Sequence, residues 1–121
     1  MTAMPRFALL AAGLIGAGGI ALSAMAAHGA DPHLIGTAAT ICLAQAPALL
    51  GIMAGYEKVR LAGLATLLIA LGTALFAGDL LFRSAYAHGL FPMSAPTGGT
   101  MMILGWLALA VSALFPSRSS E

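Results

Sequence analysis

Four apolar stretches, separated by short polar segments, dominate the pattern of hydrophobic and polar positions along this chain. They lie at about residues 7–27, 34–56, 61–82 and 97–115. Each has the ~18 or more residues that an α-helix needs to cross the ~30 Å hydrocarbon core of a bilayer. The pattern therefore predicts an all-α membrane protein. We expect a single domain over residues 1–121, in which four transmembrane helices form a compact bundle.

Composition and charge narrow the classes of partner. Hydrophobic residues make up 60% of the chain and charged residues 7%, whereas roughly 25% of residues are charged in soluble domains. The formal net charge of +1 leaves no basic surface that would bind nucleic acid through its phosphates. The single cysteine, Cys42, excludes an intrachain disulfide. We expect membrane lipids as partners, no nucleic acid and no cofactor.

The basic residues predict an orientation in the membrane. If the spans alternate in direction, Arg6, Lys58, Arg60 and Arg118 lie on one side, and Arg83 alone lies on the other. Loops on the cytoplasmic side carry an excess of Lys and Arg. Both termini are therefore predicted to be cytoplasmic.

The first span has two interpretations. Its basic start, apolar run and Ala24-Met25-Ala26 sequence also fit a cleavable secretory signal, but its length and the three later spans favour a retained helix. Small residues at Gly13, Ala17 and Ala21 have the four-residue spacing that lets helices approach closely in lipid. We expect the same packing role for four glycines in or next to the later spans: Gly78, Gly98, Gly99 and Gly105.

Asp79 and Arg83 are the charged pair closest to an apolar span. They are four residues apart, the spacing at which an acid and a base pair on one helix face. We interpret them as an ion pair near the outer boundary of the third span. The alternative is a buried proton or cation site at Asp79, because acids within membrane spans are often functional.

Gln45 is the most polar residue in the middle of the second span. It lies about 16 Å along the helix axis from Leu34, so its amide is expected to bond another helix. Together with Asp79, Arg83 and His28 it forms the candidate polar site. Whether these side chains converge on one internal cavity is left open.

The histidines His28, His33 and His88 are predicted to lie on the outer side of the membrane. Imidazole suits zinc or copper, which makes them candidate metal ligands. No two of them are spaced i and i+4, however, so we predict no metal site. One short motif occurs twice, because Ala27-His28-Gly29 recurs as Ala87-His88-Gly89. Two parallel hairpins related by an internal repeat would show such a recurrence. The sequence leaves that repeat open.

Several motifs resemble one known family. They are Ala26-Ala27-His28-Gly29, Phe76-Ala77-Gly78, and Pro96-Thr97-Gly98-Gly99 followed by Gly105-Trp106. On these the chain resembles domain-of-unknown-function family 423, which includes YgdD-like bacterial proteins and transmembrane protein 256-like eukaryotic proteins. The resemblance implies four helices, multi-pass insertion in the bacterial inner membrane and no established activity.

The chain also departs from that family's usual pattern. Gln45 stands where family members commonly have histidine, and Asp79 stands where they often have serine. Any role of that histidine or serine therefore does not carry over to this chain.

We expect a non-enzymatic integral membrane protein with a structural, assembly or lipid-associated role. Catalysis is not predicted, because no Ser/His/Asp or Cys/His set can be placed on one helix face. The alternative is a small proton- or cation-coupled transporter subunit that uses Asp79. A second copy of the chain or another membrane protein remains open as a partner.

Overall fold

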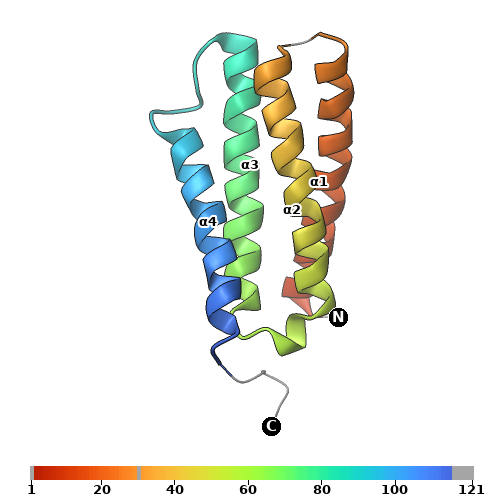
Figure 1. Ribbon diagram of the computed structural model, residues 1–121, viewed down its shortest axis with the longest axis vertical. Coiled ribbons are helices and arrows are strands. Elements are labelled where there is room, and N and C mark those ends of the chain that lie inside the picture. Colours follow the sequence, from red (N-terminus) through yellow and green to blue (C-terminus); the bar gives the residue numbers. More distant parts are fainter. Residues whose placement is uncertain (1, 30, 116–121) are drawn as a thin grey trace.

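Four long helices run up and down side by side in the computed structural model, which describes residues 2–29 and 31–115 (Figure 1). The elements are α1 (Ala3–Ala27), α2 (Pro32–Ala54), the short 3-10 helix η1 (Tyr56–Lys58), α3 (Ala62–Tyr86) and α4 (Ser94–Ser112). By length and composition, each of the four α-helices can cross a membrane. The predicted all-α fold with four transmembrane helices is confirmed.

The helix boundaries differ from the predicted ones by a few residues. α1 and α4 begin earlier than expected, with Pro5 and Pro96 in their first turns. Proline is tolerated there because the first N–H groups of a helix have no intrahelical acceptor. α3 continues to Tyr86 instead of ending near residue 82. Asp79 and Arg83 therefore lie inside a helix and do not end it.

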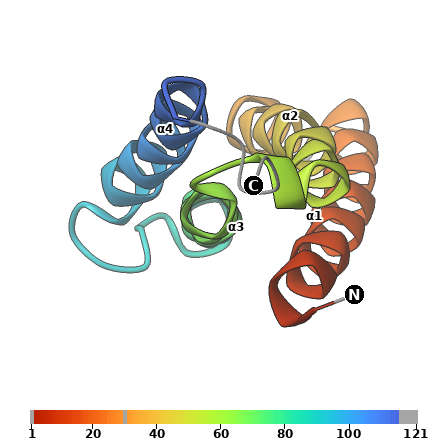
Figure 2. The same ribbon diagram turned by 90° about the horizontal axis from the view of Figure 1, so that it is seen from below.

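The helices are arranged as two hairpins joined along one line of contact. The most extensive contacts are between α1 and α2 and between α3 and α4, whereas α2 and α3 contact each other less and α1 barely reaches α3. Figure 2 shows α3 between α2 and α4, with α1 on the other side of α2. The bundle is therefore open on the side where α2 and α4 face each other.

Small side chains dominate the buried interior. Two clusters form it, one in each half of the bundle. The half near the α2–α3 turn contains Ala11, Ala12, Leu49, Ile52, Ala62, Ala65, Ile69, Ala70 and Ala108. The other half contains Leu22, Ile35, Ala38, Ala39, Cys42, Ala77 and Leu80. Helices in lipid associate through close van der Waals packing, and alanine permits that approach.

Two predicted packing glycines lie where α4 crosses α3. A Cβ built on Gly98 would lie 2.7 Å from the backbone nitrogen of Phe76 and 2.8 Å from the carbonyl oxygen of Gly72. A Cβ on Gly105 would lie 2.6 Å from Cγ1 of Ile69. The packing role of both glycines is confirmed, because any side chain there would push the helices apart.

Other packing predictions were wrong. Gly13, Ala17 and Ala21 lie on the exposed side of α1, and a Cβ on Gly13 would meet nothing within 4 Å. Cβ atoms on Gly78 and Gly99 would make only ordinary contacts, at 3.8 and 3.9 Å. In α1 the close approach to α2 is made at Gly19 instead. The helix is so rich in glycine and alanine that small residues recur every four positions on more than one face, so the spacing does not select a face.

The two Ala-His-Gly segments have different backbones. After α1, Gly29 adopts a φ of 89°. After α3, the left-handed residue is Ala87, with a φ of 65°, and Gly89 is not among the positive-φ residues. The loop of residues 87–93 is also longer than that of residues 28–31. The shared letters therefore do not correspond to a repeated loop structure.

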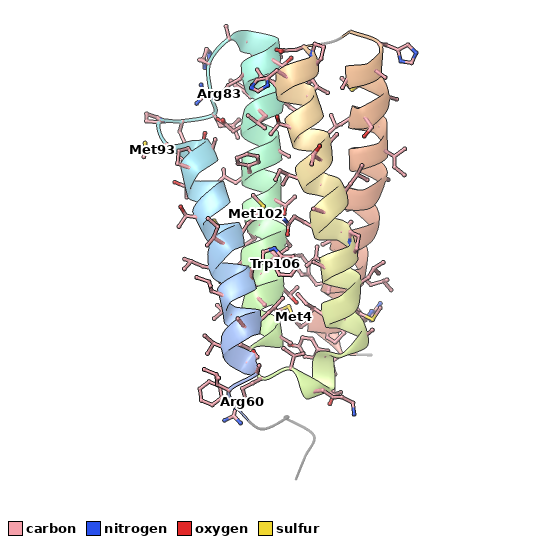
Figure 3. The ribbon with its side chains drawn as sticks, in the orientation of Figure 1. Met4, Arg60, Arg83, Met93, Met102 and Trp106 are labelled. Carbon is pink, nitrogen blue, oxygen red and sulfur yellow. The ribbon has the colours of Figure 1, made fainter. Side chains whose placement is uncertain are left out.

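Basic residues gather at one end of the bundle. Arg6 in the first turns of α1 and Lys58 and Arg60 beside the α2–α3 turn lie at the lower end in Figures 1 and 3, whereas Arg83 lies near the upper end. Arg118, which the predicted orientation also used, lies outside the described residues. Within the described residues, the basic side chains are therefore divided between the two ends of the bundle as the predicted orientation requires.

Candidate functional site

A buried ion pair lies in the last third of α3. The Asp79 side chain is completely buried, and its Oδ2 accepts a hydrogen bond from Arg83 Nε at 2.8 Å. The Arg83 side chain is 42% exposed, so the ion pair is partly buried. The predicted pairing is confirmed. Asp79 is about 10 Å along the axis from Tyr86, where the helix ends, so the pair lies within the helix.

The second oxygen of Asp79 reaches beyond its own helix. Oδ1 accepts a hydrogen bond from the backbone N–H of Leu90 at 3.0 Å and a short hydrogen bond from the hydroxyl of Ser94. Leu90 belongs to the α3–α4 loop, and Ser94, itself fully buried, is the first residue of α4. One carboxylate thus joins α3, the loop and the start of α4. We call Asp79, Arg83, Leu90 and Ser94 the Asp79 clamp.

Gly89 lets the loop lie directly over this clamp. A Cβ built on Gly89 would lie 2.9 Å from Nη2 of Arg83 and would overlap Oδ1 of Asp79. A larger residue would displace either the loop or the ion pair. Glycine is therefore required here, because the loop passes close to the Asp79 clamp. Figure 3 shows Arg83, one member of the clamp, near the upper end of the bundle.

Gln45 makes a hydrogen bond across the open side of the bundle. Its Oε1 accepts from the indole N–H of Trp106 at 3.0 Å. Gln45 is 7% exposed and Trp106 is 45% exposed, so the bond lies at the edge of the interior, in the middle of the bundle (Figure 3). The prediction that the Gln45 amide bonds another helix is confirmed, and its partner lies in α4.

A third tie joins α3 and α4 at their other ends. The hydroxyl of Ser112, the last residue of α4, accepts a hydrogen bond from the backbone N–H of Leu61 at 3.0 Å and donates one to the carbonyl of Ala108 at 2.8 Å. Leu61 precedes α3, whose first N–H groups have no intrahelical acceptor. Ser112 thus satisfies one donor next to the start of α3.

A sequence comparison places the chain in a family. Residues 22–99 match the family described as protein of unknown function (DUF423). The chain belongs to this family. No solved structure matches it.

The DUF423 match covers one of the three ties completely and one residue of each of the other two, Gln45 and Leu61. The Asp79 clamp and Gln45 lie within residues 22–99, whereas Trp106 and Ser112 lie beyond them. The clamp is thus a structural element of the family region of this chain. The α2–α4 hydrogen bond depends on α4 residues outside that region.

The predicted site residues of this DUF423 protein lie in three separate places. Asp79 and Arg83 pair with each other, and Gln45 pairs with Trp106. His28 is exposed at the end of α1, with Nδ1 2.8 Å from the carbonyl oxygen of Ala24. The described contacts therefore do not assemble these side chains around one cavity.

The candidate metal ligands are likewise spread over the α1–α2 and α3–α4 connections and the start of α2. His33 is exposed near the start of α2, and the His88 ring packs edge-on against Phe82 with the ring centres 5.3 Å apart. Within residues 2–29 and 31–115, no three His, Cys, Asp or Glu side chains lie close enough to hold a metal ion.

Sequence reasoning missed Ser94, Leu90 and Trp106. A serine before a proline-containing helix start is a signal of a helix N-terminus, and it would have placed Ser94 at the start of α4. The bond from Leu90 could not be found in this way, because it comes from a backbone N–H whose position depends on the path of the loop.

Proposed function

We propose that this DUF423 protein is a non-enzymatic structural element of the membrane, a helical bundle that acts in assembly or in contact with lipid. The observation that carries the proposal is that buried polar side chains form hydrogen bonds to other parts of the bundle. Asp79 accepts three hydrogen bonds, and Gln45 accepts one from another helix. These groups hold helices together, and their oxygens are already engaged without a substrate.

The apolar surface supports the same conclusion. Large apolar side chains are exposed along α1 and α4, including Leu10, Leu14, Ile20, Ile103 and Leu107. A bundle with such a surface contacts acyl chains or the helix of another membrane protein. We place it in the bacterial inner membrane with both termini cytoplasmic, because Arg6, Lys58 and Arg60 share one end of the bundle.

The alternative function is a small proton- or cation-coupled transporter subunit. The complete burial of Asp79 within a membrane-spanning helix favours it, since buried acids in membrane spans commonly serve as proton or ion sites. In this chain, Arg83, Leu90 and Ser94 occupy both oxygens of that acid. A transport role would require the clamp to open in each cycle.

A flux assay separates the two functions. The purified chain is reconstituted into liposomes that contain a pH-sensitive dye, and a proton gradient is imposed in Na⁺ and in K⁺ buffers. We expect the gradient to decay at the same rate as in protein-free liposomes, both for the wild type and for Asp79→Asn. Wild-type flux that is lost in Asp79→Asn, with unchanged helical content by circular dichroism, would replace the structural proposal with the transporter.

A further inference from the structure

A groove opens between α2 and α4, in the half of the bundle near the α2–α3 turn. Its volume is about 290 Å³, and its walls are Ala48, Gly51, Ile52, Val59, Trp106 and Leu109. The first three come from α2, the last two from α4, and Val59 from the turn that closes its lower end. The groove therefore has apolar walls on both sides and lies within the membrane-spanning part of the bundle.

The groove is a consequence of how α4 packs. α4 lies against α3 and not against α2, and the Gln45–Trp106 hydrogen bond crosses the gap above the groove. Small residues widen the α2 wall, because a Cβ on Gly51 would meet nothing within 4 Å. Trp106 lies about 9 Å along the α4 axis from its end at Ser112, so the groove runs from the membrane boundary toward the bilayer centre.

Two basic residues flank the lower end of the groove. Lys58 and Arg60 are the chain neighbours of Val59, and both are exposed. The guanidinium carbon of Arg60 lies 5.9 Å from the centre of the Phe115 ring, which follows the end of α4. Arg60 is thus positioned between the α2–α3 turn and α4. Glu57 is the acid in this segment, and the two bases exceed its charge.

We propose that this groove binds an acyl chain of an anionic phospholipid, whose head-group phosphate is bound by Lys58 and Arg60. The inference rests on the proposed function, a bundle in contact with lipid, and names the lipid class and the site. Apolar walls suit the hydrocarbon chain. The bases at the membrane boundary suit the phosphate, because a Lys or Arg near an anionic membrane surface strengthens binding about fivefold.

The two bases argue against a helix as the occupant of the groove. A helix of a second copy would bring its own apolar surface and would not need Lys58 and Arg60. A single acyl chain with a charged head uses both features.

The single tryptophan of the chain provides the assay. Trp106 lines the groove and is 45% exposed, so bromine atoms on a bound acyl chain quench its fluorescence. The chain is reconstituted into bilayers with increasing fractions of dibrominated phosphatidylglycerol or of dibrominated phosphatidylcholine. We expect quenching by the anionic lipid at a several-fold lower mole fraction than by the zwitterionic lipid.

Three variants locate the site. Lys58→Gln with Arg60→Gln should remove the preference for the anionic lipid, a change of at least about fivefold. Arg6→Gln removes an exposed charge at the same end of the bundle, on α1 and away from the groove, and should leave the preference unchanged. Gly51→Leu fills the groove and should reduce quenching by both lipids.

Equal quenching by the two lipids in the wild type would overturn the inference. The inference would also be overturned if Arg6→Gln reduced the preference for the anionic lipid as much as the double variant does. Quenching that Gly51→Leu leaves unchanged would place the lipid outside the groove and overturn the site. Failure of the proposed function would appear as proton flux in the liposome assay. The quenching experiments do not measure flux, so failure of the lipid site and failure of the proposed function can be told apart.

Discussion

The two hairpins of the bundle are held together in different ways. α3 and α4 approach until backbone meets backbone at Gly72 and Gly98. The Ser94 hydroxyl donates a hydrogen bond at one end of the pair, and the Ser112 hydroxyl accepts one from Leu61 at the other end. Where α1 approaches α2, Gly19 meets the Leu43 side chain instead.

The polar side chains show the same difference. In the α1–α2 hairpin, His28, Thr37 and Thr40 contact carbonyl oxygens of their own helices. In the α3–α4 hairpin, Asp79 bonds residues of the loop and of the next helix. The closest contact of the α1–α2 hairpin can therefore adjust, whereas the closest contact of the α3–α4 hairpin has a fixed geometry.

The largest expected effect comes from adding one methyl group at the α3–α4 crossing. Gly98→Ala should lower the free energy of unfolding by about 3 kcal/mol, at the upper end for overpacking, because the nearest atoms belong to the backbone of α3 and cannot rotate away. The measurement is SDS-induced unfolding in mixed micelles, followed by far-ultraviolet circular dichroism.

Gly19→Ala is the matched control in the other hairpin. Its Cβ would lie 2.9 Å from side-chain atoms of Leu43, which can change rotamer, and 3.1 Å from Cβ of Cys42, which must shift slightly. Alanine is favoured over glycine in a helix by ~1 kcal/mol, and this gain offsets the cost of the shift. The net change should be near zero. Equal losses in Gly19→Ala and Gly98→Ala would refute the contrast between the hairpins.

An intermediate effect is expected from removing the carboxylate of the Asp79 clamp. Asp79→Ala deletes three hydrogen bonds, each worth ~0.6 kcal/mol between membrane helices, so the free energy of unfolding should fall by about 2 kcal/mol. Ser94→Ala removes one of the three bonds and should cost about a third as much. The same unfolding assay checks both, and a Ser94→Ala loss as large as that of Asp79→Ala would contradict the shared clamp.

The smallest effect is expected at the bond between the hairpins. Trp106→Phe keeps an aromatic ring but removes the donor to Gln45, and the expected loss is ~0.6 kcal/mol. A double-mutant cycle with Gln45→Met isolates this bond from the change in ring size. A coupling energy indistinguishable from zero would mean that the hairpins are joined by the packing of α3 against α2 and α1, without a contribution from this hydrogen bond.

The sequence predicted the fold well and the site only in part. The four apolar stretches identified the helices, and the spacing of Asp79 and Arg83 identified their pairing, because both signals are local. The partners of Oδ1 were not predictable, since Leu90 and Ser94 reach Asp79 only through the path of an irregular loop.

The choice among the small residues also failed for a physical reason. Gly13, Ala17 and Ala21 have the same spacing as residues that do pack, and only the neighbouring helix determines which face is used. Gly98 and Gly105 do pack closely on α3, but the same reasoning also selected Gly99, which makes only an ordinary contact.

The Asp79 clamp also sets an order of events during synthesis. The ribosome makes Asp79 fifteen residues before Ser94, a delay of roughly 1–3 seconds at ~5–20 residues per second. Arg83 is made four residues after Asp79, whereas the two donors to Oδ1 come later, Leu90 after eleven residues and Ser94 after fifteen. The Oδ1 contacts of Asp79, which join α3 to the loop and to α4, therefore form only after the start of α4 has been made.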